Sequence, residues 1–125
     1  MDRIGIDVVP LSRIRTSLDR HKDAFLAKIL TPKEGEYCAG VRMIERVAGR
    51  VAAKEAVMKV IGEGWPAVSW TDIEVLPGAS GRPVVSLSGR AREFAAAAGL
   101  DALDVSITHD GDLAIAAALG TVRRA

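Results

Sequence analysis

Residues 46–64, RVAGRVAAKEAVMKVIGEG, decide the fold, because they have the length and spacing of one long helix that must lie against a core. Lys54 falls in the middle of the apolar side of this helix, and Arg50 lies on the same side one turn earlier. A charge among apolar neighbours is costly unless it is paired or held by a ligand. The apolar stripe around these two charges is formed by Val47, Val51, Val57, Met58 and Ile61.

An acidic and a basic residue stand beside this stripe. Glu55 and Lys59 are four positions apart, so they share a neighbouring face of the helix and are expected to form an acid–base pair. The sequence therefore predicts a helix that meets something charged.

Composition limits the class of protein. The 125 residues carry a net charge of +1, with 49% hydrophobic and 26% charged residues, which predicts a single globular domain over residues 1–125. The near-neutral charge and the 4% aromatic content argue against a nucleic-acid partner.

The expected compartment follows from the cysteine count and from the apolar runs. The single cysteine, Cys38, excludes an internal disulfide. No apolar run reaches membrane-spanning length, and Asp7 interrupts the start of the chain where a signal peptide would stay apolar. We expect a cytoplasmic protein with no membrane partner.

The order of the expected elements predicts a mixed α/β (α+β) domain, with most helices in the first half and largely antiparallel strands in the second. A capping box at Thr31 and Glu34 begins one helix, and Asp110-Gly111 predicts a hairpin between the last two strands. Helices are expected over 11–20, 24–30, 32–40, 41–61 and 89–98, and strands over 3–9, 70–76, 83–87, 103–108 and 113–119.

Asp7 and Glu55 are the candidate metal ligands. Each has a simpler explanation, since a strand-end Asp and a helical Glu often just face water. Together they supply two hard oxygen donors from separate elements, and Mg²⁺ typically takes one or two carboxylates plus phosphate oxygens.

Other motifs of catalysis and binding are weak or missing. Neither His109, at the end of a strand, nor His21 indicates a ligand by itself. Gly62 and Gly64 follow a helix instead of preceding one, which excludes a phosphate-binding P-loop. With one cysteine the chain cannot build the usual zinc sites, and no nucleophile motif surrounds Cys38.

Taken together, several segments resemble the holo-acyl-carrier-protein synthases, the small 4′-phosphopantetheinyl transferases. The matches lie in the family's order and span nearly the whole chain. They are IGIDVV (4–9), SRI (12–14), ILT (29–31), AGRVAAKEA (48–56), WTDIEV (70–75), GRP (81–83) and VSITH (105–109).

The resemblance implies a reaction and a fold. Such enzymes move 4′-phosphopantetheine from coenzyme A to a serine of apo acyl carrier protein and release adenosine 3′,5′-bisphosphate. Their fold is a mainly antiparallel sheet against a long central helix. Asp7 and Glu55 would hold Mg²⁺ at the pyrophosphate, and Lys59 would stabilise the pyrophosphate or the leaving phosphate. The base for the serine proton is Glu55 or a metal-bound water.

The resemblance also assigns contacts to the nucleotide. Arg50, Lys54 and His109 would bind the nucleotide and its phosphates, which would explain a lysine in apolar surroundings. Two glycine-containing segments would let the backbone approach the cofactor, namely Gly62 with Gly64, and Gly81, Arg82 and Pro83.

Family assembly and partners follow in the same way. The family forms homotrimers with each cofactor site between two subunits, and it docks an acidic carrier on a basic first helix. Arg13 and Arg20 would be the docking residues here, in a segment that also contains Arg15 and Lys22. A merely solvated basic face is the simpler alternative for such a run.

Four positions depart from the family pattern. Val51 and Arg46 replace aromatic residues, which predicts altered core or interface packing. Pro10 replaces a glutamate at the start of the carrier-binding helix, and Asp110 adds a negative charge beside His109. Two other functions remain open, a catalytically silent binder of coenzyme A or carrier protein and a Mg²⁺-dependent phosphohydrolase.

Overall fold

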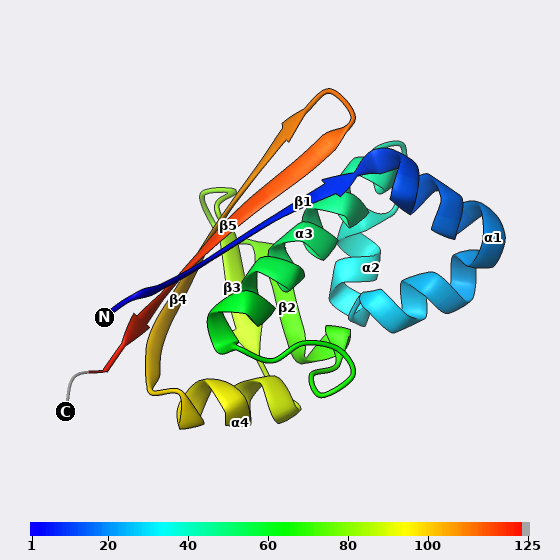
Figure 1. Ribbon diagram of the computed structural model, residues 1–125. Coiled ribbons are helices and arrows are strands. Elements are labelled where there is room, and N and C mark those ends of the chain that lie inside the picture. Colours follow the sequence, from blue (N-terminus) through cyan, green and yellow to red (C-terminus); the bar gives the residue numbers. More distant parts are fainter. Residues whose placement is uncertain (124–125) are drawn as a thin grey trace.

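A long central helix, α3 (Met43–Ile61), lies against one face of a three-stranded sheet in the computed structural model, which describes residues 1–123 (Figure 1). The sheet is antiparallel throughout, in the order β1 (Arg3–Pro10), β5 (Leu113–Val122) and β4 (Leu100–Asp110). This arrangement confirms the expected fold class, a mainly antiparallel sheet on a long central helix.

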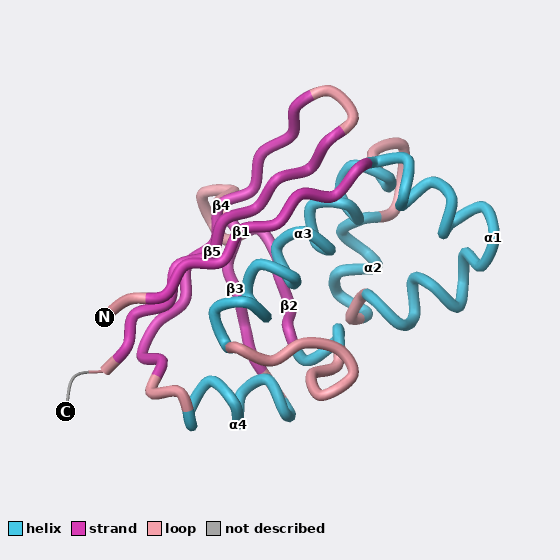
Figure 2. Tube along the Cα trace, viewed as in Figure 1, coloured by secondary structure: helices cyan, strands magenta, loops and turns pink. Residues whose placement is uncertain are grey.

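The remaining elements lie beside α3 and near one end of the large sheet (Figures 1 and 2). Helix α1 leads directly out of β1, and the short α2 follows it, so both pack beside α3. Beyond α3 the chain forms a two-stranded sheet and a last helix. These elements are α1 (Leu11–Ile29), α2 (Pro32–Cys38), the 3₁₀ turn η1 (Trp70–Asp72), β2 (Ile73–Pro77), β3 (Pro83–Leu87) and α4 (Gly89–Ala97).

Alternation along β1 gives the large sheet two unlike faces. Gly5, Asp7 and Val9 point toward α3, while the residues between them point away from it. The strand comes so close to the helix that a methyl group on Gly5 would collide with the backbone carbonyl of Ala56. Glycine at this position therefore sets how near β1 lies to α3.

The face of the sheet that points away from α3, called here the outer face, is apolar and exposed. Ile4 keeps 75% and Ile6 59% of its accessible surface, and Leu119 pairs with Ile4 across the strands. Together with Val8 these side chains form a continuous apolar surface, unlike the scattered single residues that are normal on a monomer. No helix within residues 1–123 is long and apolar enough to cross a membrane.

Burial on α3 extends around the whole helix instead of following one stripe. The sheet covers one side, and α1, α2 and β2 cover another, so even small residues such as Ala48, Ala52 and Ala53 are fully buried. A helix that is apolar on all sides belongs inside a core. The predicted stripe was therefore too narrow, although its five members are all buried.

Most expected elements are confirmed with small shifts of their ends, and two are different in kind. The segments 11–20 and 24–30 form one helix, α1, with a kink at His21 (φ −147°, ψ 54°). Residues 70–72 form the turn η1 before the strand begins at Ile73. Pro10 stands just before α1 and supplies no side-chain cap. The capping box of Thr31 and Glu34 is confirmed.

Candidate functional site

Asp7 and Glu55 meet where β1 crosses α3. Asp7 lies on the inner face of β1, two residues from Gly5, and Glu55 precedes Ala56 on the helix. Their side chains retain 14% and 23% of their accessible surface, respectively. The close approach of strand and helix thus brings together two acids that lie 48 positions apart in the sequence.

Electrostatics at this pair favour an added proton or cation. Burial, a hydrogen bond to Asp7 and the negative charge of Asp7 together raise the pKa of Glu55 to about 7, against the opposing effect of Arg13. Within the described residues, Oδ2 of Asp7 is buried without a hydrogen-bond partner. A buried oxygen left unpartnered beside a second carboxylate is what a hard cation would occupy.

Two cations flank the pair, but not in the arrangement expected from the sequence. Arg13 donates to Oε1 of Glu55 at 3.2 Å. Lys59 donates to the carbonyl of Ile6 at 2.7 Å and reaches Oδ1 of Asp7 at 3.5 Å. The predicted Glu55–Lys59 pair is therefore wrong, because β1 draws the lysine toward its own backbone.

The carboxylate pair fits a magnesium ion whose coordination is completed by a substrate. Among residues 1–123 no group of three or more His, Cys, Asp or Glu could hold a metal ion, so Asp7 and Glu55 are a two-ligand set. Mg²⁺ accepts such a set when phosphate oxygens and waters fill the other positions. The donors present thus suit a metal that arrives with a diphosphate.

Arg50 lies in a basic cluster near the start of α3. Its side chain is buried, with 6% of the residue exposed, and its Nε has no hydrogen-bond partner among the described residues. Its guanidinium lies 4.9 Å from the ring centre of Tyr37, and that of Arg46 lies 4.6 Å from the same centre. Arg46 also donates to the Tyr37 carbonyl at 2.7 Å.

Two members of this cluster were missed in the sequence. Arg46 was noted only as a replacement for an aromatic residue, and Tyr37 carried no signal, because its ring reaches α3 from the separate helix α2. The cluster also accounts for Cys38. Burial raises the pKa of its thiol against the opposing charge of Arg50, which keeps it protonated and unreactive.

His109 lies near the same end of α3. Its Nε2 is 2.9 Å from the carbonyl of Glu45, and its ring faces Gly49, where a Cβ would lie 3.5 Å from Cε1. The structure thus brings His109 to the helix that carries Arg50.

Lys54 requires a correction. Its ammonium group donates to Ile29 O at 2.6 Å, Glu34 Oε1 at 2.6 Å and Trp70 O at 3.0 Å. All three hydrogens are used, and no part of the side chain is exposed. The expected contact with nucleotide phosphates is therefore ruled out in this structure, and the alternative explanation, a buried partner, applies.

The glycine-containing segments lie at two different places. Gly62 ends α3 in the left-handed conformation (φ 90°), and Gly64 follows it near Met58. Arg82 forms an ion pair with Asp104, and together with Pro83 it lines a hollow of about 450 Å³ on the outer face of the sheet. Within one chain, this hollow and the Asp7–Glu55 pair lie on opposite faces.

The expected carrier-docking residues lie along α1. Arg13 lies in the first turn of α1, where it donates to Glu55, and Arg20 lies two turns further along the helix. Arg20 lines a groove of about 410 Å³ together with Thr16, Phe25 and Lys28. A basic groove thus begins one turn beyond the carboxylate pair.

Comparison with known proteins agrees with this arrangement. The family model of the 4′-phosphopantetheinyl transferase superfamily matches residues 3–118. The holo-[acyl-carrier-protein] synthase of Moorella thermoacetica is 44% identical, with 92% of this chain and 90% of the relative covered. That of Desulforudis audaxviator is 40% identical, with 93% and 89% covered.

Solved structures show the same fold. The Helicobacter pylori holo-[acyl-carrier-protein] synthase in complex with coenzyme A superposes with a TM-score of 0.85 at 32% identity, covering 95% of this chain and all of that one. The Bacillus anthracis synthase in complex with coenzyme A (3′,5′-ADP) has a TM-score of 0.77 at 35% identity, with 96% of both chains covered. With its paired carboxylates and matching fold, the chain belongs to the holo-acyl-carrier-protein synthase family of 4′-phosphopantetheinyl transferases.

Proposed function

We propose that the chain transfers 4′-phosphopantetheine from coenzyme A to a serine hydroxyl of an apo acyl carrier protein, releases adenosine 3′,5′-bisphosphate and requires Mg²⁺. The observation that carries this proposal is the meeting of Asp7 and Glu55, where one buried carboxylate oxygen has no hydrogen-bond partner within residues 1–123. Family membership supports it, as does the coenzyme A bound to the Helicobacter pylori relative.

The reaction exchanges a phosphoanhydride bond of coenzyme A for a phosphoester bond to the serine. The serine oxygen bonds to the phosphorus that carries the pantetheine, and the bond from that phosphorus to the bridging oxygen breaks. The bisphosphate leaves with the bond's electron pair. A divalent cation bound by Asp7 and Glu55 would neutralise charge on the diphosphate as this happens.

Lys59 and Glu55 have separate tasks in this scheme. Lys59 is held by the Ile6 carbonyl and lies beside Asp7, and its side chain remains 56% exposed, so its ammonium group can reach the leaving phosphate. Glu55 is one candidate for the group that accepts the serine proton, since its carboxylate lies at the site and has a pKa of about 7 in the metal-free protein.

The basic cluster provides the nucleotide contacts. Arg50 has a buried, unpartnered Nε, and His109 lies near the same end of α3, so we assign both to the phosphates of the nucleotide portion. Arg46 stacks on the same tyrosine as Arg50 and adds a second guanidinium there. Lys54 is excluded from this group because its hydrogens are already used.

A homotrimer would complete the site. The apolar outer face of the sheet needs a cover, and the hollow lined by Arg82 and Pro83 opens on that face, away from Asp7. A copy of the chain seated there would bring this hollow, with Gly81 beside it, toward a neighbour's metal pair. Gly62 and Gly64 would approach the cofactor from the end of α3.

The carrier would dock on α1. Arg13 and Arg20 stand on the groove side of this helix, and an acidic carrier would be steered there by charge. Cytoplasmic location remains a prediction from the sequence, and a role in fatty-acid biosynthesis is what the family resemblance implies.

Transfer is tested by mass spectrometry of apo carrier protein incubated with coenzyme A and Mg²⁺. We expect a phosphopantetheine adduct on the carrier with the unchanged protein. The variants Asp7→Asn and Glu55→Gln should each lower the rate by about a hundredfold or more while remaining folded, because each removes a metal ligand.

Two outcomes would contradict the proposal. Failure of the unchanged protein to modify any competent carrier would exclude the transferase. Release of the bisphosphate from coenzyme A without a carrier would indicate a phosphohydrolase instead.

The raised pKa of Glu55 predicts how stability of the metal-free protein depends on pH. The folded-state pKa of about 7 lies above the ordinary value of 4.5 for a glutamate, so the stability due to Glu55 is present at low pH and lost as pH rises through 7. Between about pH 5 and pH 8, the melting temperature of the metal-free protein should fall relative to that of Glu55→Gln. A constant difference over this range would show that the pKa of Glu55 is not raised in the folded protein.

Light scattering tests the trimer. The unchanged protein should have three times the chain mass of 13.2 kDa. Ile6→Lys places a charge on the outer face and should yield a folded monomer with little transfer activity. Val41→Lys is the matched control, since Val41 is fully exposed in the loop before α3 and should leave the trimer intact. A trimer that survives Ile6→Lys would place the interface elsewhere.

A further inference from the structure

The ion pair of Lys54 and Glu34 is completely buried, and the stability it contributes does not by itself explain why. Both side chains are 0% exposed, and Nζ lies 2.6 Å from Oε1. Removing two charges from water costs about as much as their attraction returns, so such pairs are often no more stabilising than apolar residues of equal size. A gain in folding stability is therefore a weak explanation for the presence of this pair. Its position in the fold offers another explanation.

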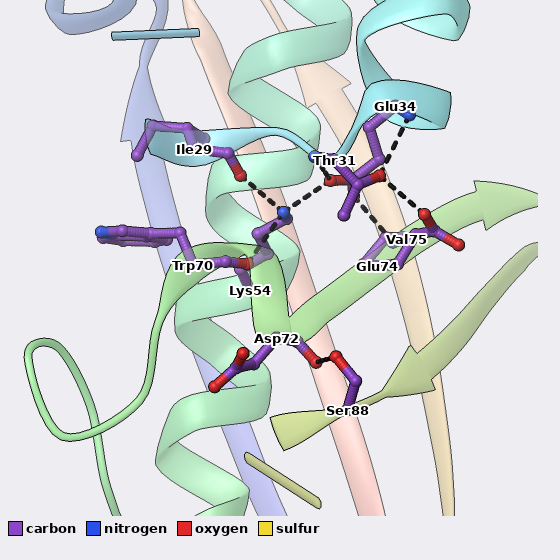
Figure 3. A network of polar contacts seen from close by, with 9 residues as sticks. All are labelled: Ile29, Thr31, Glu34, Lys54, Trp70, Asp72, Glu74, Val75 and Ser88. Atoms are coloured by element: carbon purple, nitrogen blue, oxygen red, sulfur yellow. Dashed lines mark hydrogen bonds and ion pairs between the residues drawn. The ribbon is translucent and has the colours of Figure 1, made fainter. Parts of the chain in front are cut away.

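The pair ties one turn of α3 to four other segments (Figure 3). Lys54 donates to the carbonyls of Ile29, at the end of α1, and Trp70, in η1. Glu34 accepts from the backbone of Thr31 at 2.9 Å and of Val75, in β2, at 2.8 Å. Each bond is directional, so together they fix the rotation of α3 about its own axis at this turn.

The neighbouring residue on that turn is Glu55. Consecutive helical residues are about 100° apart, so while Lys54 faces α2 and η1, Glu55 faces Asp7 on β1. The contact between Gly5 and Ala56 sets the distance of the strand, but a glycine has no side chain that could fix the helix's rotation. A twist of about 20° would move a carboxylate roughly 6 Å from the axis by about 2 Å.

We propose that Glu34 and Lys54 are positioning residues, which hold the rotation of α3 so that the Glu55 carboxylate meets that of Asp7 at the metal position. This inference rests on the proposed function, since the metal pair is its object. Neither residue touches substrate, and both act through Glu55.

The test replaces both charges at once with Lys54→Met and Glu34→Gln. The double variant leaves no buried charge, keeps the side-chain volumes, and retains a carbonyl at position 34 that can accept one backbone bond. Binding of Mn²⁺ in the presence of coenzyme A is followed by the electron paramagnetic resonance signal of free Mn²⁺. Coenzyme A affinity without metal is measured by calorimetry, and kcat by carrier modification.

We expect the Kd for Mn²⁺ to rise about tenfold or more and kcat to fall by a similar factor, while metal-free affinity for coenzyme A changes less than about twofold. The single variant Glu34→Gln can keep the bond from Thr31 through its carbonyl but loses the bond from Val75, and it should show a smaller change in the same direction. It serves as the test if the double variant does not fold.

Val47→Ala is the matched control. Val47 is fully buried in α3, two turns before Lys54, and its truncation lowers stability without touching the ion pair. It should leave both the Kd for Mn²⁺ and kcat within about twofold of the unchanged protein.

Two results would overturn the positioning role. One is a folded double variant, or a folded Glu34→Gln, that binds Mn²⁺ and turns over like the unchanged protein. The other is an equal loss in Val47→Ala, which would show that general loosening is enough. If the unchanged protein itself shows neither Mn²⁺ binding with coenzyme A nor transfer, the proposed function fails instead.

Discussion

The packing of the β1 backbone against the α3 backbone, at Gly5 and Ala56, is the constraint on which the rest of the molecule depends. A larger residue in place of Gly5 would push the strand outward, and Asp7, two residues along on the same face, would move with it. At this close crossing, burial together with the hydrogen bond and charge of Asp7 raises the pKa of Glu55, and among the described residues one Asp7 oxygen is buried without a partner. The close packing of β1 on α3 and the meeting of Asp7 with Glu55 thus both depend on Gly5.

The two faces of the large sheet carry different features. The inner face carries Asp7 and lies on α3, whereas the outer face is apolar and borders the hollow of Arg82 and Pro83. A single chain therefore holds the Asp7–Glu55 pair and this hollow apart, and the proposed trimer would join them between neighbours. On this view the exposed apolar surface serves assembly and substrate binding together.

Local signals in the sequence predicted much of this structure. The capping box at Thr31, the hairpin at Asp110-Gly111 and the long helix follow from short-range spacing, and all are present. The convergence of Asp7 and Glu55 was expected first as two loose oxygen donors and then from the family resemblance. Their pairing itself depends on a contact between elements that local patterns do not encode.

The errors about side-chain contacts concern partners distant in the sequence. Lys54 was recognised as needing a buried partner, but Glu34, 20 positions earlier on α2, could not be chosen from spacing alone. Glu55 was matched to Lys59 by helical periodicity, while the fold supplies Arg13 from α1 instead. In the same way, Tyr37 receives two arginines from α3 only because α2 packs beside it.

The most direct measurement is a crystal structure of the protein grown with Mg²⁺ and coenzyme A. The account predicts a single ion at the crossing of strand and helix, with one oxygen of each acid within about 2.1 Å of it and diphosphate oxygens among its remaining ligands. An ion bound elsewhere, or carboxylates that turn away from each other around the bound cofactor, would contradict it.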